Sequence, residues 1–380
     1  MSTIKAASKI EPMLITAELN KTFISETLND LRMRLSKVVM NARTFSGIQP
    51  TGALHLGNYL GAVKRWADQV QNVKSAQERD DNIFCVVDQH AITLPQNPVK
   101  LRSNIRTMTA SLLACGLDPS KCILFQQSTV PEHSELCWVL STLCSVPRLG
   151  QLTTYKEKAA KLKEIPLGLF IYPVLQAADI LLYRAASVPV GEDNIQNLQV
   201  AQHLAHKFNR NFCSSKKPLF PKPEAILPDN TAARLRSLRS PDHKMSKSDP
   251  DPLSCIYLSD SDDVVVKKIK SSVTDSNREL FFDPVSRPGV SNLITIYSLM
   301  TDQTEEQVSS YLQQNSINKV QFKHMVSESL IARLSPIRNE MERLLADQQY
   351  LDSVMSQGTN AASIMAKETM CEVRKLIGWR

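Results

Sequence analysis

The sequence predicts an α/β fold, in which a parallel β-sheet with crossover helices is followed by an α-helical C-terminal region. Between Thr44 and about Arg239, short apolar runs alternate with segments of helical periodicity, which is the pattern of a parallel sheet. Beyond about residue 260 the strand pattern fades, and apolar residues keep helical spacing. With 380 residues, 42% of them hydrophobic, the chain is long enough for two or three domains with buried cores.

The same periodicity assigns the elements in chain order. Residues 83–87 and 123–125 are apolar runs typical of buried strands. Helical spacing predicts helices over 105–115, 132–144, 173–183 and 326–344 and, less regularly, over 364–377. A stretch rich in Pro, Ser and Lys, residues 214–252, predicts the connection between the two kinds of structure. We therefore expect four parts: 1–43, 44–239, 240–345 and 346–380.

Residues 1–43 differ in composition from the rest of the chain. They contain no glycine, and from Leu31 to Asp68 there is no acidic residue, while leucines and valines share a helical face beside several arginines. This composition is typical of an organelle transit segment and predicts the mitochondrial matrix, with Met33 as an alternative start. Acidic residues nearer the N-terminus, such as Glu11 and Glu18, favour the alternative, an N-terminal extension without a targeting function on a cytoplasmic protein.

Charge and cysteine usage narrow the class of protein. The 45 basic and 38 acidic residues leave a net charge of +7, which permits a polyanionic partner without requiring one. No apolar stretch approaches the roughly 20 residues that cross a bilayer, so we expect no membrane partner. The eight cysteines form no C-x-x-C pair, which argues against a zinc site and leads us to expect no bound metal in the protein itself.

The first motif that can carry chemistry lies in residues 47–62. Gly47 and Gly52 have Walker A spacing, but Ala53-Leu54 replaces the Lys-Ser/Thr that binds phosphate, which excludes a P-loop. Residues 55–62 then place glycines and a histidine at the start of a helix, where free backbone N–H groups bind phosphate and His55 adds a donor. The alternative is an ordinary turn.

The second motif is Lys-Met-Ser-Lys-Ser, residues 244–248. Two lysines three residues apart, with serine hydroxyls and loop-forming neighbours, can surround a polyphosphate. The alternative is a solvated basic loop. Farther along the chain, Lys267, Lys268 and Lys270 form a second basic cluster, either facing phosphate or lying on a solvated helix face.

A single acid, Asp179, lies in the long apolar run 169–179. An unpaired carboxylate would be costly in such surroundings, so we expect it to have a specific function. Tyr172, Gln176 and Asp179 lie at i, i+4 and i+7 and therefore on one helical face. The alternative role for Asp179 is a structural one, as a cap or in an ion pair with Arg184.

Together, His-Leu-Gly-Asn at 55–58 and Lys-Met-Ser-Lys-Ser at 244–248, about 190 residues apart, resemble the two signature sequences of class I aminoacyl-tRNA synthetases. Four further strings resemble tryptophanyl-tRNA synthetases of the bacterial and mitochondrial type: 45–52, 87–93, 188–193 and 270–275. The resemblance runs from about Thr44 to the C-terminus. It implies a Rossmann-like nucleotide-binding core with an α-helical C-terminal domain.

The resemblance also implies an activity and a set of ATP-binding residues. The family activates tryptophan with ATP, which brings Mg²⁺ with it, and transfers the product to tRNA. The implied ATP-binding residues are Gln49, Pro50, Thr51, Gly57, Asn58, Gly191, Glu192, Asp193, Leu235, Lys244, Met245, Ser246, Lys247 and Ser248. The implied catalytic residues are His55, Lys158, Lys244, Ser246 and Lys247.

For the amino acid, the resemblance implies a pocket in which Asp179 accepts the indole N–H. The remaining implied tryptophan-binding residues are Phe45, Gln49, Tyr172, Gln176 and Asn194. Gln176 stands where bacterial members usually carry methionine, and Asn194 where many carry glutamine. Because Gln and Asp also bind tyrosine in tyrosyl-tRNA synthetases, the pocket helix alone leaves tyrosine open, and the loops at 47–52 and 188–193 favour tryptophan.

The resemblance implies tRNA(Trp), L-tryptophan and a second copy of the chain, in a homodimer, as partners. The helical C-terminal region would read the anticodon. One alternative is a tyrosyl-tRNA synthetase, and another is a non-catalytic tRNA-binding paralogue. Against the latter, His55, Gly57, Lys244 and Lys247 are all present.

Overall fold

A computed structural model describes residues 43–160, 162–227, 235–247 and 249–379. The predicted targeting segment, including Met33, therefore lies outside the described residues, except for Arg43. Ser248 of the second motif lies outside them too. Among the described helices, none is long and apolar enough to span a membrane.

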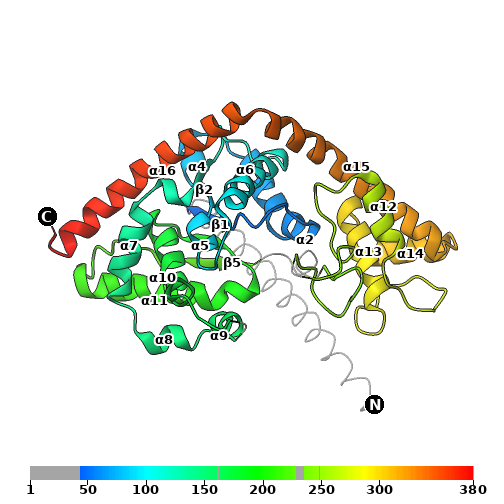
Figure 1. Ribbon diagram of the computed structural model, residues 1–380, viewed down its shortest axis with the longest axis horizontal. Helices are drawn as coiled ribbons and strands as arrows, with labels where there is room; N and C mark the ends of the chain where they lie inside the picture. The colour runs from blue at the N-terminus through cyan, green and yellow to red at the C-terminus, as the bar shows by residue number, and fades with distance from the viewer. Residues whose placement is uncertain (1–42, 161, 228–234, 248, 380) are drawn as a thin grey trace, which may run out of the picture. The chain divides into compact units, whose positions relative to one another are not determined.

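The centre of the structure is a five-stranded parallel sheet with the strand order β3-β2-β1-β4-β5 (Figure 1). Its strands are β1 (Thr44–Ile48), β2 (Asn82–Val86), β3 (Ile123–Gln126), β4 (Ser187–Pro189) and β5 (Glu224–Ile226). This confirms the predicted α/β fold with a Rossmann-like parallel core. The strand order reverses between β1 and β4, and ligands of such sheets bind outside the carboxyl ends of the strands at that point.

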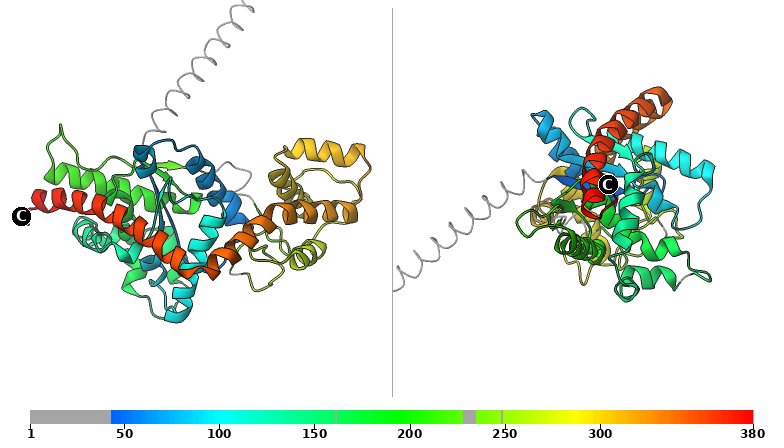
Figure 2. Two further views of the ribbon diagram at one scale, coloured as in Figure 1. Left: turned by 90° about the horizontal axis from the view of Figure 1, so that it is seen from above. Right: turned by 90° about the vertical axis from the view of Figure 1, so that its left-hand side faces the viewer.

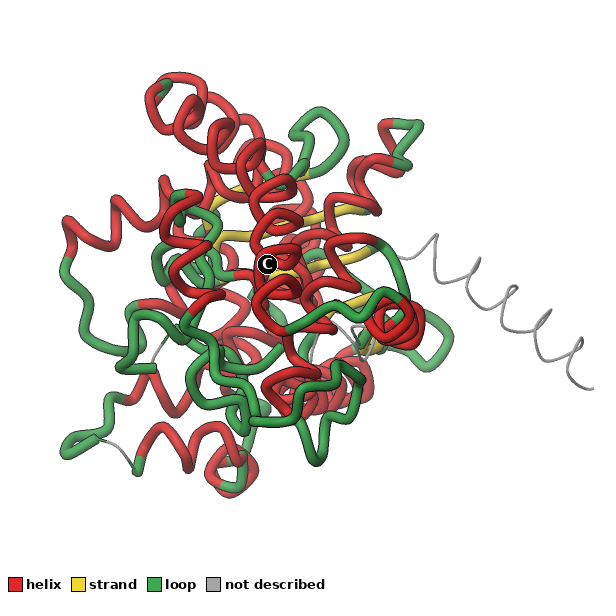
Figure 3. Tube along the Cα trace, turned by 90° about the vertical axis from the view of Figure 1, so that its right-hand side faces the viewer, coloured by secondary structure: helices red, strands yellow, loops and turns green. Residues whose placement is uncertain are grey.

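Helices cover both faces of the sheet, with strands and helices in layers (Figure 3). Because side chains alternate along a strand, Phe84 and Val86 of β2 join one core, while Ile83 and Cys85 join the other. The first core includes residues of α3 (Lys64–Gln71), α6 (Pro98–Ala114) and the C-terminal helices. The second includes residues of α7 (Glu132–Ser141), α10 (Leu167–Leu182) and α11 (Ile195–Phe212).

Two predicted helices begin earlier in the structure than the sequence suggested. Helix α6 begins at Pro98 rather than near residue 105, because the Asn97 side chain accepts hydrogen bonds from the N–H groups of Val99 and Lys100. Helix α10 begins at Leu167 and includes Pro173, so the predicted start at residue 173 was wrong. A proline favours the first turn of a helix, and at an interior position it loses one hydrogen bond.

Shorter helical segments connect these elements. They are α2 (Leu56–Asn58), the π-helix η1 (Tyr59–Val63), α4 (Ala76–Asp80), α5 (Asp88–Ala91), η2 (Gln127–Thr129), α8 (Val146–Gly150), α9 (Thr153–Ala159) and η3 (Glu192–Asn194). The run α2, η1 and α3 is continuous from Leu56 to Gln71, which places the first motif at the start of a helical segment.

In the described part of the chain beyond β5, all long elements are helices, as predicted. They are α12 (Asp262–Lys270), α13 (Pro288–Thr301), α14 (Glu305–Gln314), α15 (Lys319–Ala346) and α16 (Gln348–Leu376). Helix α15 packs on α12, α13 and α6. The side chain of Lys268 is buried and donates to Asp260 Oδ2 (2.7 Å) and to the Cys255 carbonyl (2.8 Å), so this lysine does not face phosphate.

The last helix returns to the sheet. Helix α16 packs along β3 and against α7 (Figure 2). The contact is so close that a Cβ on Gly358 would lie 1.8 Å from the Leu124 carbonyl oxygen. Residues 346–380 thus belong to the packing of the α/β core as well as to the helical region. The predicted boundaries at 239 and 345 stay predictions.

Candidate active site

A cavity of about 820 Å³ opens at the carboxyl ends of β1 and β4. This volume suits a ligand of nucleotide size. The described residues that line it come from the segment after β1, the segment at and after the end of β4, the end of β5, and Leu235 with the Lys-Met-Ser-Lys-Ser loop. The lining includes ten of the residues predicted to bind ATP or act in catalysis: His55, Gly57, Asn58, Gly191, Glu192, Asp193, Leu235, Lys244, Met245 and Ser246.

The buried His55 imidazole is held as a neutral donor. Its Nδ1 accepts a hydrogen bond from the Asn58 backbone N–H (3.2 Å), and the Asn58 Oδ1 accepts from the His55 N–H (3.4 Å). Since Nδ1 accepts, the ring proton lies on Nε2. Burial, with a smaller contribution from the charges of Lys247 and Lys244, lowers the pKa of His55 to about 4. A Cβ on Gly57 would lie 3.0 Å from the imidazole Cε1, so glycine leaves room for the ring.

Backbone hydrogen bonds tie the first motif to the chain that follows the second. The Leu56 N–H donates to the Ile256 carbonyl (2.8 Å), and the Leu258 N–H donates to the Leu54 carbonyl (2.9 Å). These bonds flank an antiparallel bridge between His55 and Tyr257. The backbone therefore holds the first motif against residues 256–258, which follow the second motif in the chain.

The second motif forms a turn whose apolar residues are buried. Leu235 and Met245 are 2% and 3% exposed, and the Met245 N–H donates to the Leu235 carbonyl (3.0 Å). Burying these two side chains leaves Lys244 exposed at the cavity. Lys247 instead reaches the loop after β1, where its Nζ lies 3.3 Å from Thr51 Oγ1, and burial lowers its pKa.

Not every predicted ATP-binding residue lines the cavity. Thr51 is exposed and contacts Lys247, while Gln49 is exposed and Pro50 is buried in the same loop. In the described residues these three precede the cavity rather than line it. Gly191 lines it, and a Cβ there would lie 2.6 Å from Asp193 Oδ1, so this position requires glycine or a displaced aspartate.

Sequence reasoning missed nine lining residues. They are Gly61, Ala62, Arg65, Trp66, Gln69, Pro189, Val190, Ile226 and Leu227. A signal for two of them was present, because Gly57, Gly61 and Arg65 follow one another at i, i+4 and i+8 and so share a helical face. Arg65 closes one wall by donating to the Leu227 carbonyl (2.9 Å).

The Asp179 side chain is buried, 1% exposed, and three side chains donate to its carboxylate. Oδ1 accepts from Gln127 Nε2 (2.7 Å) and His133 Nδ1 (2.6 Å), and Oδ2 accepts from His90 Nε2 (2.7 Å). Arg184, the alternative partner predicted from the sequence, is not among them. A carboxylate offers about four acceptor positions. Among the described residues the three donors leave one position open, on Oδ2.

The charge of Asp179 is stabilised by these donors. Burial alone would raise the pKa of the carboxyl group, but the charges and hydrogen bonds of His90 and His133 lower it below its ordinary range. The Gln127 amide cannot turn freely, because its Oε1 accepts from the Gln89 N–H (3.1 Å). Asp179 is therefore an ionised acceptor in an apolar surround.

Two of the other predicted tryptophan-site residues, Phe45 and Tyr172, lie near residues that connect to Asp179. Phe45 is in the core, 3% exposed, and stacks on Tyr183 with ring centroids 5.6 Å apart. Tyr183 in turn places its hydroxyl 2.8 Å from His133 Nε2. Tyr172 donates its hydroxyl to Thr154 (2.8 Å), and Lys158 Nζ lies 4.7 Å from the centre of the Tyr172 ring, which brings α9 against α10.

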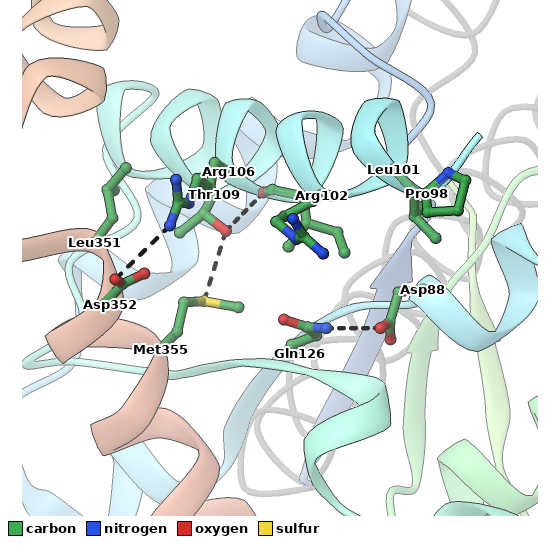
Figure 4. A pocket seen from close by; sticks show the side chains of 11 residues that line it. Asp88, Pro98, Leu101, Arg102, Arg106, Thr109, Gln126, Leu351, Asp352 and Met355 are labelled. Carbon is green, nitrogen blue, oxygen red and sulfur yellow. Dashed lines mark hydrogen bonds and ion pairs between the residues drawn. The ribbon is translucent and has the colours of Figure 1, made fainter. Parts of the chain in front are cut away.

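A second cavity, of about 440 Å³, lies between α6 and α16 (Figure 4). At its floor the Asp88 carboxylate accepts from Gln126 Nε2 (2.7 Å) and from the Ser128 N–H (2.9 Å). These bonds join α5, which carries His90, to the end of β3 and to η2, which carries Gln127. The wall of the second cavity therefore supports the donors that hold Asp179.

Comparisons with known proteins show which family the chain belongs to. The model of the family "tRNA synthetases class I (W and Y)" matches residues 39–335. A tryptophan–tRNA ligase of Brucella melitensis is 42% identical over 354 residues, covering 88% of this chain and 97% of that protein. The mitochondrial tryptophan–tRNA ligase of Saccharomyces cerevisiae is 41% identical over 366 residues, covering 92% and 94%.

Solved structures of the same family are similar to the chain. Tryptophanyl-tRNA synthetase of Mycoplasma pneumoniae has a TM-score of 0.78 at 30% identity, covering 89% of this chain and 97% of its own. That of Campylobacter jejuni, complexed with ADP and tryptophan, has a TM-score of 0.74 at 32% identity, covering 88% and 99%. The chain belongs to the class I tRNA synthetases, in the tryptophan–tRNA ligase family.

Proposed function

We propose that this chain activates tryptophan with ATP, releasing pyrophosphate, and then transfers the tryptophanyl group to tRNA(Trp). The observation that carries the proposal is that His55 and Lys244 line a nucleotide-sized cavity, while Lys247 contacts the loop after β1 and lies close enough for its charge to lower the pKa of His55. Helix α10 adds the ionised Asp179. Tryptophan–tRNA ligases at 40–42% identity support tryptophan, rather than tyrosine, as the amino acid.

In the first step the tryptophan carboxylate attacks the α-phosphorus of ATP, and the bond to pyrophosphate breaks. The residues near the cavity supply donors and positive charge where the phosphates would lie: His55 Nε2–H, the ammonium groups of Lys244 and Lys247 and the Ser246 hydroxyl. At neutral pH the His55 ring is uncharged, because its pKa is about 4. Its single proton lies on Nε2, because Nδ1 accepts a hydrogen bond from the Asn58 N–H. Such fixed donors stabilise the charge that develops as pyrophosphate leaves.

Mg²⁺ would accompany the phosphates of ATP. Two cavity carboxylates, Glu192 and Asp193, provide oxygen ligands of the kind that this ion takes together with substrate phosphates. Within the described ranges, no group of three His, Cys, Asp or Glu side chains is placed to hold a metal. The donor set therefore fits an ion shared with the nucleotide, which would neutralise phosphate charge.

For tryptophan, the open acceptor position on Asp179 Oδ2 would receive the indole N–H. The polar part of the tryptophan site would be formed by Tyr172, Gln176, Asn194 and Gln49. Phe45 would act indirectly, because it stacks on Tyr183, whose hydroxyl lies within hydrogen-bond distance of His133. Lys158 would approach the leaving group from α9, which contacts Tyr172. A pocket built on this hydrogen bond disfavours apolar amino acids that cannot donate one.

We extend the proposal to the partners and the compartment. The helices α12–α15, which correspond to the predicted part 240–345, would contact the tRNA anticodon region. Large exposed apolar side chains on two touching helices, Trp138 on α7 and Ile364 on α16, support a homodimer. The mitochondrial yeast relative supports a mitochondrial location. Sedimentation of the protein at micromolar concentration tests the dimer.

The experiment that tests the function is aminoacylation of a tRNA(Trp) transcript with labelled tryptophan. We expect tryptophanyl-tRNA to form with the wild type. For Asp179→Ala we expect a large loss of tryptophan use, with ATP affinity retained. Binding of the tRNA without charging would instead favour a non-catalytic tRNA-binding protein. An Asp179→Ala variant that is unfolded, but whose folded fraction keeps its specificity, would mean that Asp179 is structural.

A further inference from the structure

The two residues at which this chain departs from the family pattern, Gln176 and Asn194, meet at one buried side chain. Asn197 lies in the first turn of α11 and is 1% exposed. Its Nδ2 donates to Gln176 Oε1 (3.2 Å) and to Asn194 Oδ1 (3.2 Å). The three amides therefore form one hydrogen-bonded unit that joins α10, η3 and α11.

This unit fixes which end of each amide is available to a ligand. Asn197 Nδ2 has two hydrogens, and both go to amide oxygens. The Oε1 of Gln176 is thereby turned toward Asn197, so that the N–H₂ end of this half-buried side chain is the end left for the amino-acid site. Asn194 is oriented in the same way and directs its Nδ2 toward Asp193 Oδ2 (3.4 Å).

Packing alone does not explain why an asparagine stands at position 197. Its own Oδ1 is buried and has no hydrogen-bond partner among the described residues. A buried acceptor without a partner costs free energy, roughly 1–3 kcal/mol. Turning the amide over would leave the nitrogen unpaired instead and would place the oxygen against the amide oxygens of Gln176 and Asn194, which cannot donate to it. An apolar side chain of similar size would avoid this cost, so the two donated hydrogen bonds are what asparagine provides here.

We propose that Asn197 is a positioning residue for amino-acid recognition. It acts through Gln176 and Asn194 and rests on the tryptophan site proposed above. Gln176 and Asp179 lie at i and i+3 on α10 and so share a face, where Asp179 presents the acceptor and Gln176, held by Asn197, presents donors. The amide unit thus determines that hydrogen-bond donors, rather than acceptors, face the ligand beside the open position on Asp179 Oδ2.

The test compares two asparagines of the same helix in the full-length protein, the buried Asn197 and the half-buried Asn209. Asn209, also on α11, donates to the Phe220 carbonyl (2.7 Å) and accepts from the Leu219 N–H (3.0 Å), and it lies outside the amide unit. We expect Asn197→Ala to raise the KM for tryptophan about tenfold, with KM for ATP unchanged, since the hydrogen bonds that orient Gln176 and Asn194 are lost. We expect Asn209→Ala to lower Tm without changing the KM for tryptophan.

Two further variants separate positioning from structure. Asn197→Leu keeps the branched shape of the side chain but is larger, and it removes the unpaired oxygen together with both donated hydrogen bonds. We expect the same rise in tryptophan KM, with Tm measured on the same preparation to show that the variant is folded. Gln176→Met removes the group through which Asn197 acts. In that background, Asn197→Leu should therefore have a much smaller effect, a coupling that a double-mutant cycle measures.

Unchanged tryptophan KM in Asn197→Leu, or effects of Asn197→Leu and Gln176→Met that simply add, would overturn this inference and leave the proposed function intact. A wild type that shows no tryptophan-dependent ATP–pyrophosphate exchange would overturn the proposed function itself. The two failures are therefore distinguishable in a single set of assays.

Discussion

At the scale of single residues, the protonation of His55 is set by its surroundings. Burial and two lysines lower its pKa from 6.5 to about 4, so between these pH values the unfolded chain binds a proton that the folded chain does not. His55 therefore makes its full contribution to the free energy of unfolding above pH 6.5, and this contribution is lost as the pH falls toward 4.

The measurement is the free energy of unfolding of the wild type and of His55→Gln between pH 4 and 8. We expect the difference, wild type minus variant, to be constant above about pH 7 and to decrease steadily below pH 6.5. A difference that does not depend on pH would show that His55 titrates normally in the folded protein.

Lys247 is placed to act on the phosphates, because its ammonium bridges the second motif and the loop after β1. We expect Lys247→Ala to reduce the rate of tryptophan activation by about two to four powers of ten, with little change in Tm. Lys217→Ala, at an exposed lysine outside the cavity lining, is the matched control and should retain activity. Near-wild-type activation in Lys247→Ala would remove this lysine from the mechanism.

The residue scale also shows where sequence reasoning ends. In the sequence, Asp179 is a single acid in an apolar run, which implied apolar surroundings. In the structure its side chain is indeed buried. Its three donors were not identified, because His90, Gln127 and His133 come from separate segments that only the fold brings together. Phe45 sits deeper than a ligand-facing residue, since alternation along β1 turns it into the core.

At the scale of elements, strands β2 and β3 and most helices follow from the apolar pattern, because long buried runs carry a strong signal. Strands β4 and β5 have three residues each, too few for a period to appear. The start of α10 was misplaced because Pro173 lies inside the helix. Helix α16 was recognised only weakly, and its packing on β3 is a long-range contact that no local pattern contains.

The contact of α16 with β3 depends on one glycine. A methyl group at position 358 would lie 1.8 Å from the Leu124 carbonyl oxygen, a backbone atom that cannot move aside without shifting the strand. We expect Gly358→Ala to destabilise the protein by at least about 1–3 kcal/mol, the usual cost of overpacking. Urea denaturation followed by circular dichroism measures this loss.

Gly150→Ala is the control, because a Cβ at position 150 meets nothing within 4 Å. We expect it to leave the urea midpoint essentially unchanged. Equal midpoints for Gly358→Ala and wild type would contradict the close packing of α16 on the sheet.

At the scale of the whole molecule, the site is assembled from parts that are distant in sequence. Backbone bonds between Leu56 and Ile256 and between Leu54 and Leu258 join the first motif to the segment after the second. The sequence predicted that the two motifs work together, by resemblance. It could not supply these bonds, because they link strand-like segments that pair for only a few residues.

The central claim is that one chain recognises tryptophan through Asp179 and activates it at the adjoining nucleotide cavity. Amino-acid-dependent ATP–pyrophosphate exchange, run on the full-length protein against all twenty amino acids, tests it most directly. We predict exchange with tryptophan alone. Exchange with tyrosine would mean that Gln176 and Asp179 select a phenol rather than an indole, and no exchange with any amino acid would contradict the catalytic account.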